Sequence, residues 1–321
     1  MQVTSLFSKG RLVTIPIEQN DSTIGGLVPA YSTELGVMYR GLAESMDNPE
    51  FINKYKGKID LILTSPPFPL NRKKKYGNRQ GVDYINWITG FVGLFRKLLK
   101  PRGSIVIELG NAWEPGHPVM STLALRALLS FLDRGEFKLA QQFIYYNKAR
   151  LPGPAQWVNV KRIRVKDAYT YIWWMSPSAY PYANNRRILV PYKKDMLDLL
   201  KTGKYNSGRR PSEHVIGTKS FLKDNGGAIP SNVLEFANTN SSDSYLDYCE
   251  RHNLERHPAR MNINVATFFV KLLTTPRSLV LDPFAGSNTT GFVAEQLGRG
   301  WLSVEPEEKY IASSRGRFFS D

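Results

Sequence analysis

Short apolar runs alternate with amphipathic stretches along this chain. Residues 59–63 form an apolar run that predicts a buried strand, and apolar side chains recur at helical spacing over residues 82–99. Residues 104–108 are the next short apolar run and end on a carboxylate. A strand, a helix and a strand in succession predict a parallel βαβ unit, whose functional loops lie at the carboxyl ends of the strands. We therefore expect Ser65 and Glu108 to emerge at the same edge of a sheet.

Similar patterns divide the rest of the chain into ordered and irregular parts. Further strands are predicted at residues 37–41, 143–146, 169–175, 278–282 and 301–305, and helices at 42–53, 121–132, 265–273 and 292–297. Residues 1–36 are polar and mixed, which favours low order or a peripheral arm. Residues 176–255 are rich in Pro, Gly, Asn and Ser, and their pattern is weak. The pattern predicts one α/β domain from residues 1–175 and 256–321, with 176–255 as a smaller region of long loops.

The first candidate site is Thr64–Phe68, directly after the strand at residues 59–63. Each proline fixes φ and removes an N–H, so the carbonyls of Ser65 and Pro66 have fewer local donors. A small hydroxyl, freed carbonyls and an aromatic ring could hold a planar amine and stack on its ring. On these residues alone, a strand that ends in a proline turn without chemistry is the simpler interpretation.

A second candidate site is the turn from Asp282 to Gly291, which joins a strand to a helix. Glu305 closes the next strand about 20 residues later, an arrangement that holds a nucleoside in Rossmann-like folds. The turn lacks the GxGxxG pattern, and Asp282 disfavours a phosphate but favours a cationic group such as a sulfonium. The cofactor predicted is S-adenosylmethionine rather than NAD, although a structural α/β turn would show the same glycine.

The order of the two sites along the chain predicts the topology. The turn at Asp282 lies near the C-terminus, whereas a Rossmann sheet that began with its nucleotide half would place it early. A circularly permuted, mostly parallel sheet flanked by helices and closed by strands from both ends of the chain reconciles the two sites.

Charge indicates the class of partner. The chain has 43 Lys and Arg against 28 Asp and Glu, a net charge of +15, which suggests a polyanion such as nucleic acid, although a solvated basic surface would look similar. The single cysteine excludes a disulfide framework, the four histidines form no ligand cluster, and no apolar run is long enough for a membrane helix. We expect a cytoplasmic protein without a metal site. The candidate DNA contacts are Arg72, Lys73, Lys74, Lys75, Tyr76, Arg79, Lys161, Arg162, Arg164, Arg209 and Arg210.

The motifs and their order resemble one protein family. TSPPF at residues 64–68, HPAR at 257–260 and DPFAGSNTTG at 282–291 are similar to the motifs of bacterial cytosine-N4 DNA methyltransferases of restriction–modification systems. The resemblance is to the permuted group, in which the catalytic motif precedes the cofactor motif. It extends from about residue 37 to 318 and is weakest over 176–220, where members read different DNA sequences. It implies the permuted methyltransferase fold and makes 176–255 the target-recognition region.

The resemblance also implies roles for individual residues. Ser65 and the Pro66 carbonyl would hold the target amine beside Pro67, and Phe68 would stack on the flipped base. The implied cofactor contacts are Asp282, Pro283, Phe284, Ala285, Gly286, Ser287 and Thr289, with Glu305 on the ribose and His257, Pro258, Ala259 and Arg260 closing the pocket.

The chain departs from the family pattern at two acids. Relatives usually place an acid after the glycine that ends the strand at 37–41. Leu42 follows Gly41 here, so Glu44 or a backbone carbonyl would meet the adenine amine of the cofactor. At Glu108 a shorter acid is usual in relatives. Glu108 would orient Ser65 or take up a proton, and its reach to the serine is open.

Elementary chemistry separates the candidate reactions. Methylation of cytosine carbon 5 needs a cysteine nucleophile, typically after a proline, whereas Cys249 follows Tyr248 in a polar segment. Methylation of an exocyclic amine needs no covalent intermediate, only acceptors for its hydrogens and alignment with the methyl group. We expect N4-cytosine methylation of double-stranded DNA, with a cognate restriction endonuclease as a possible partner. The alternatives are an adenine-N6 enzyme, which usually has Asp or Asn in place of Ser65, a catalytically silent DNA-binding protein, and an RNA methyltransferase.

Overall fold

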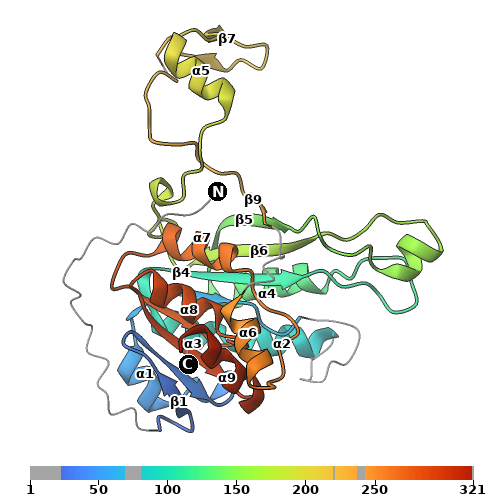
Figure 1. Cartoon of the computed structure of the whole chain (residues 1–321), viewed down its shortest axis with the longest axis vertical. Helices are drawn as coiled ribbons and strands as arrows, with labels where there is room; N and C mark the ends of the chain where they lie inside the picture. The colour runs from blue at the N-terminus through green and yellow to red at the C-terminus, as the bar shows by residue number, and fades with distance from the viewer. Residues whose placement is uncertain (1–22, 69–80, 220, 237–242, 320–321) are drawn as a thin grey trace.

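One large mixed sheet forms the centre of the protein (Figure 1). The computed structural model describes residues 23–68, 81–219, 221–236 and 243–319. Within these ranges nine strands lie in the order β1-β2-β11-β10-β3-β4-β6-β5-β9. Their bounds are β1 Val28–Ser32, β2 Gly36–Arg40, β3 Ile59–Thr64, β4 Leu99–Gly110, β5 Lys138–Tyr146, β6 Tyr169–Ser176, β9 Val233–Glu235, β10 Leu279–Asp282 and β11 Gly300–Glu305.

The middle of the sheet is parallel and joins the two ends of the chain. β2, β11, β10, β3 and β4 pair in parallel, whereas β1, β6 and β5 add antiparallel pairs. Leu61 of β3 pairs with Val280 of β10, so the strand before the proline motif lies beside the strand before the glycine turn. The permuted, mostly parallel sheet predicted from the sequence is confirmed. Its parallel strands end at Arg40, Thr64, Gly110, Asp282 and Glu305.

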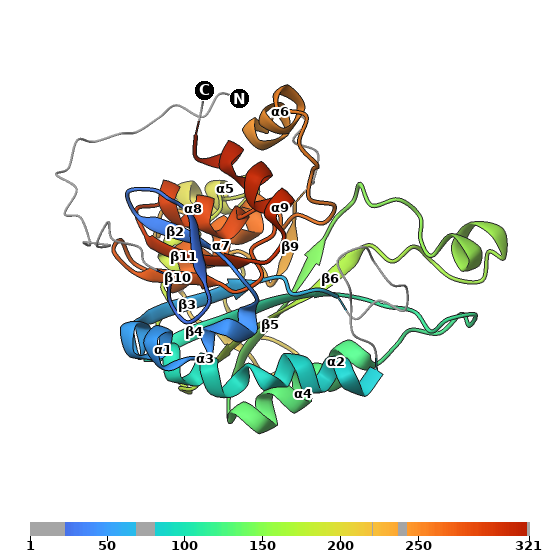
Figure 2. The same cartoon turned by 90° about the horizontal axis from the view of Figure 1, so that it is seen from below.

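Helices cover both faces of the sheet (Figure 2). One face carries the helices α1 Pro49–Tyr55, α2 Gly81–Gly90, α3 Val92–Leu98 and α4 Leu123–Gly135, and the other carries α7 Ile263–Leu273, α8 Thr289–Gln296 and α9 Glu308–Ser314. A hydrophobic core lies on each face of the sheet, and successive strand residues point into one core or the other. Ile62 packs against the first group of helices, and Leu61 and Leu63 pack against the second. None of the helices in the described ranges is long and apolar enough to cross a membrane.

Three predicted elements differ from the structure. Val28–Ser32 pairs with β2 as an edge strand, so low order was the wrong prediction for these residues, whereas residues 1–22 lie outside the described part of the chain. The helix predicted at 42–53 is a 3-10 turn, Ala43–Met46, followed by α1, whose amino end is capped by Asn48. The helix predicted at 82–99 is divided into α2 and α3 next to Phe91, and Leu99 already begins β4.

The region at residues 176–255 contributes to two parts of the molecule. Residues 190–228 project as a lobe that carries α5 Lys194–Thr202 and the short strands β7 Gly208–Arg209 and β8 Val215–Ile216 (Figure 1). Paired hydrogen bonds between Val190 and Ala228 close its base. In contrast, β9 pairs with β5, and α6 Ser244–Arg251 packs against α9 and the 3-10 helix Arg315–Arg317. These two elements therefore belong structurally to the sheet domain.

Candidate functional site

A cavity at the carboxyl ends of β3, β10 and β11 brings the two candidate sites together. Thr64 and Asp282, the last residues of β3 and β10, are joined by a hydrogen bond of 2.6 Å from the Thr64 hydroxyl to the Asp282 carboxylate. The lining of the cavity includes Ser65, Pro66, Pro67, Phe68, His257, Ala259, Met261, Asp282, Phe284, Ala285, Gly286, Ser287, Thr289, Thr290, Glu305, Pro306, Glu307 and Tyr310. Motifs that are far apart in the sequence thus share one wall because β3 and β10 are neighbours.

Asp282 provides a buried negative charge beside this cavity. Its side chain is 4% exposed, and its Oδ1 accepts hydrogen bonds from the Thr64 hydroxyl and, at 3.1 Å, from the Phe284 N–H. Burial raises the pKa of Asp282 to about 6, against the opposing effect of these hydrogen bonds. The carboxylate is therefore mostly ionised at neutral pH, and it favours a cationic group in the cavity over a phosphate.

Glu305 is held at the opposite side of the glycine turn. Its Oε2 accepts the Gly286 N–H at 2.8 Å, and its Oε1 accepts the Glu307 N–H at 3.1 Å. Burial raises the pKa of Glu305 to about 7, although both backbone hydrogen bonds lower it. Each carboxylate oxygen has a further lone pair, so Glu305 can also accept hydrogen bonds from a vicinal diol such as a ribose.

Gly286 is required where the turn meets the segment that contains His257. Its φ of +52° lies in the left-handed region, and a Cβ at this position would be 2.9 Å from His257 Nε2. A larger residue would therefore be strained and would push the two walls apart. The His257 ring itself packs edge-on against Tyr310 with 4.5 Å between ring centroids. The turn and the 257–261 segment together form a narrow cradle.

A second cavity of about 180 Å³ adjoins the first. Four residues, Ser65, Phe68, Ala259 and Met261, line both cavities. The others that line the second are Glu108, Tyr145, Asn147, Arg150, Ala168, Thr170 and Arg260. The Phe68 ring lies directly over Gly110, where a Cβ would be 2.5 Å from the ring. The proline motif therefore forms the partition between two cavities.

Glu108 lies in the second cavity close to Ser65. Thr64 pairs with Ile107 across β3 and β4, so Ser65 and Glu108 follow at the same level of the sheet. The Glu108 side chain is 6% exposed, and its Oε1 accepts the Thr170 hydroxyl at 3.1 Å. Burial raises the pKa of Glu108 to about 7, with the Thr170 bond and the charge of Arg150 opposing. Glu108 is therefore hydrogen-bonded to Thr170, and its predicted role in orienting Ser65 stays a prediction.

Some predicted cofactor residues lie beside the first cavity without lining it. The Gly41 N–H donates to the Glu305 carbonyl at 3.2 Å, which places Gly41 at the rim of the sheet. Glu44 accepts the indole N–H of Trp87 at 2.8 Å, and Trp87 packs on Phe284, which does line the cavity. Pro258 and Pro283 are also absent from its lining, and Arg260 lines the second cavity instead.

Of the predicted DNA contacts that the structure describes, four are exposed, Lys161, Arg162, Arg164 and Arg209, and Arg210 is half-buried. Lys161, Arg162 and Arg164 lie in the connection between β5 and β6, and Arg209 is in β7 of the projecting lobe, next to Arg210. The predicted contacts Arg72, Lys73, Lys74, Lys75, Tyr76 and Arg79 lie outside the described residues.

Sequence patterns missed several residues that line the cavities. Tyr145 and Thr170 of the second cavity are in strands β5 and β6, and Asn147 and Arg150 follow β5 in its connection to β6; no motif in the sequence marks them. Glu307 and Tyr310 begin the helix after β11. Their place directly after the carboxyl end of a parallel strand is the signal that would have identified them.

Comparisons with known proteins agree with this geometry. The sequence model of a family described as DNA methylase matches residues 59–315. The chain belongs to the DNA methylase family. The Type II methyltransferase M.PvuII of Proteus hauseri is 41% identical over 308 residues, 95% of this chain and 90% of that protein. M.HpaI of Haemophilus parainfluenzae, also a Type II methyltransferase, is 24% identical over 280 residues, 84% of this chain and 71% of that protein. The family resemblance inferred from the motifs is confirmed.

Solved structures also resemble this DNA methylase. The PvuII DNA methyltransferase, described as cytosine-N4-specific, matches with a TM-score of 0.72 and 35% sequence identity, covering 91% of this chain and 89% of that one. M1.HpyAVI in complex with SAM matches with a TM-score of 0.52 at 17% identity, covering 89% of this chain and 100% of that one. The second likeness concerns the fold alone.

Proposed function

We propose that this DNA methylase transfers a methyl group from S-adenosylmethionine to the N4 amine of a cytosine flipped out of double-stranded DNA. The main observation in support is that Ser65 and Phe68 line both cavities and lie between the first cavity, at the glycine turn, and the second cavity, which contains Glu108. A cofactor on one side and a base on the other would meet at the proline motif. The cytosine-N4-specific PvuII enzyme, 35% identical in the structural match, supports the choice of base.

The first cavity fits S-adenosylmethionine, which supplies an electrophilic methyl group on a sulfonium. Asp282 provides a buried carboxylate for the positive end, and Glu305 has acceptor capacity for the ribose hydroxyls. Gly286 has no side chain, so the glycine turn can approach His257 closely and form one narrow wall of the cavity. Phe284, backed by Trp87, offers an aromatic face at the rim. These groups match the parts of the cofactor in charge, hydrogen bonding and shape.

In the second cavity the residues would act on the amine of the flipped base. Its lone pair is delocalised into the ring, so acceptors for its hydrogens are needed to localise the pair. The Ser65 hydroxyl and the Pro66 carbonyl are such acceptors, and Phe68 can stack on the base and offset part of the cost of flipping. Methylation leaves one proton to be removed from N4. Glu108, with a pKa of about 7, is suited to take it at neutral pH.

Double-stranded DNA is the proposed substrate, in agreement with the net charge of +15. Within residues 176–255, the lobe at 190–228 is the part that we propose for target recognition, since β9 and α6 pack with the sheet domain. Arg209 in this lobe is exposed and Arg210 is half-buried, and both are basic residues suited to phosphate contacts. Since the relatives are Type II methyltransferases, we also propose a cytoplasmic protein that protects DNA from a cognate restriction endonuclease.

Nucleoside analysis of methylated DNA tests the proposal. Purified protein is incubated with mixed-sequence duplex and labelled S-adenosylmethionine, and the DNA is digested to nucleosides. We expect N4-methylcytosine as the labelled product. N6-methyladenine alone would identify an adenine enzyme, and absence of transfer to any duplex, with DNA binding retained, would favour a silent DNA-binding protein. If RNA is added as a competitor and receives the labelled methyl group in place of the duplex, the substrate would be RNA.

A further inference from the structure

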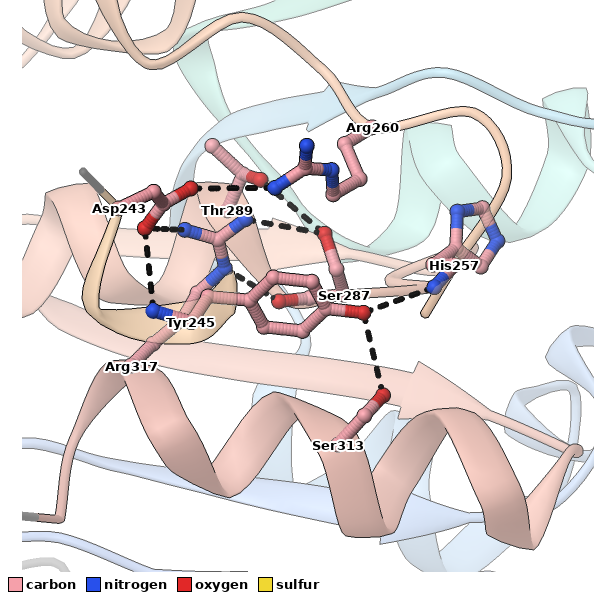
Figure 3. A network of polar contacts seen from close by, with 8 residues as sticks. All are labelled: Asp243, Tyr245, His257, Arg260, Ser287, Thr289, Ser313 and Arg317. Carbon is pink, nitrogen blue, oxygen red and sulfur yellow. Dashed lines mark hydrogen bonds and ion pairs between the residues drawn. The ribbon is translucent and has the colours of Figure 1, made fainter. Parts of the chain in front are cut away.

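A buried polar network joins the two walls of the first cavity (Figure 3). One wall is the turn that contains Ser287 and Thr289, and the other is the segment from His257 to Arg260. The network begins at Arg317, which is 5% exposed and lies in the 3-10 helix near the end of the chain. Neither Arg317 nor the carboxylate it approaches is among the residues that line the cavity.

Arg317 fixes the first wall through two contacts with one residue. Its Nε donates to the Ser287 carbonyl at 2.6 Å, and its Nη2 is 3.2 Å from the Ser287 hydroxyl. That hydroxyl lies 3.3 Å from the hydroxyl of Thr289. Because a guanidinium is planar and its donors are held in a fixed fork, it sets the orientation of the turn as well as its position.

Asp243 connects Arg317 to the second wall. Its Oδ2 lies 3.1 Å from Arg260 Nη1, and its Oδ1 lies 3.7 Å from Arg317 Nη1. Oδ1 also accepts the Tyr245 N–H at 3.2 Å, so Asp243 caps α6 at the same time. The carboxylate is 11% exposed, and Arg317 has an exposed side-chain fraction of 1%. One buried anion thus lies between two cations that belong to different parts of the site.

Tyr245 completes the link between the walls. Its ring lies under both guanidinium groups, with 4.7 Å from Arg317 Cζ and 5.2 Å from Arg260 Cζ to the ring centroid. Its hydroxyl accepts the His257 N–H at 2.8 Å and lies 3.2 Å from the Ser313 hydroxyl. The amino end of α6 therefore contacts the backbone of the second wall as well as the arginine that holds the first.

We infer that Asp243 and Arg317 are positioning residues for cofactor binding, which hold the Ser287 turn and the 257–260 segment at the separation that the bound cofactor needs. The inference rests on the proposed function, because it takes the cofactor to be S-adenosylmethionine. A network that only stabilised the fold could end within α6 and the last helices. Here its donors reach Ser287 and its acceptor reaches the His257 backbone, and both residues line the cavity.

Replacement of Arg317 by lysine separates positioning from stability. Arg317→Lys keeps the positive charge near Asp243 and loses the fork that reaches both oxygens of Ser287. We expect the Kd for S-adenosylmethionine, measured by calorimetry on the full chain without DNA, to rise about 10-fold, as for the loss of one charge-assisted hydrogen bond. The loss in kcat at saturating cofactor should be much smaller. The melting temperature should fall by a few degrees, because the lost hydrogen bonds are buried, but the protein should remain folded.

Two further variants complete the test. Glu250→Gln is the control: it breaks an exposed ion pair, 3.1 Å long, between Glu250 of α6 and Arg256. It should leave the Kd for S-adenosylmethionine unchanged. Asp243→Asn should raise the Kd, and combined with Arg317→Lys it should raise it by less than the product of the single effects, because the two residues act through one network.

A wild-type Kd in a folded Arg317→Lys protein would overturn the inference. So would a lowered melting temperature with an unchanged Kd, which is the signature of a purely structural role. Failure of the unmodified chain to bind S-adenosylmethionine would refute the cofactor assignment of the proposed function, and the inference with it.

Discussion

The buried carboxyl of Glu108 predicts a specific dependence of stability on pH. Its pKa is raised from 4.5 to about 7 in the folded protein, which means that the folded state binds the proton more tightly than the unfolded chain. Stability from this group is fully present below pH 4.5 and is lost as the pH rises towards 7. The shift corresponds to about 3 kcal/mol, and most of the loss, roughly 2.5 kcal/mol, falls between pH 5 and 8.

Replacement of Glu108 by glutamine should remove this component. The amide keeps an oxygen that can accept the Thr170 hydroxyl, so the comparison isolates the charge. We expect the free energy of unfolding of Glu108→Gln, relative to the unmodified protein, to improve by roughly 2.5 kcal/mol from pH 5 to pH 8. Asp282 and Glu305, whose pKa values are also raised by burial, are present in both proteins and cancel in the difference.

Urea unfolding followed by tryptophan fluorescence at pH 5, 6, 7 and 8 provides the measurement. Parallel stability curves for the two proteins would refute the reasoning, since they would mean that Glu108 titrates alike in the folded and unfolded states. A Thr170→Val protein gives a second check. The Thr170 hydrogen bond lowers the pKa of Glu108, so its loss should raise that pKa further. The total fall in stability with pH should then be larger and extend to higher pH.

Three other outcomes test the proposed site. Ser65→Ala should lower methyl transfer about 100- to 1000-fold while cofactor and DNA binding are retained, and near-normal turnover would exclude Ser65 from the mechanism. Neutralising Lys73, Lys74 and Lys75 together should reduce the slope of log K against log salt by up to about 2.7 in a DNA-binding titration, and an unaltered slope would assign them to solvent. Glu305→Gln should weaken S-adenosylmethionine binding about 10-fold by calorimetry, because the NH₂ group of the new glutamine would face a backbone N–H. Equal affinity would show that the ribose is held elsewhere.

The sequence was sufficient to predict the parallel part of the sheet and the two turns that line the first cavity. Residues 59–63 and 279–282 are short apolar runs that end on polar groups, and such runs are typical of parallel strands buried on both faces. The backbone conformation of the proline motif and of the glycine turn is determined locally, because proline fixes φ and glycine permits positive φ. Their meeting in one cavity followed from the rule that functional loops gather at the carboxyl ends of parallel strands.

Other features depend on contacts that a local pattern does not contain. β1 is a five-residue edge strand with an irregularity after Pro29, and only its pairing with β2 makes it a strand. β9 is three residues long and joins β5 across the sequence. The bond between Glu108 and Thr170 likewise depends on the pairing of β4 with β6, and a hydroxyl in a strand gives no sign of its partner. In each case the tertiary neighbour, rather than the residue's own propensity, decides the outcome.

The hydrogen bond between Thr64 and Asp282 spans 218 residues of sequence, which has a consequence for synthesis of the protein. During translation Thr64, which precedes the proline motif, leaves the ribosome 218 residues before Asp282 of β10. The parallel pairing of β3 with β10 must therefore wait until the residues between them have been synthesised, and contacts of such long range form slowly. A nascent chain of this methylase should thus acquire the capacity to bind its cofactor in one late step, and ribosome-bound intermediates should be unable to modify the DNA around them.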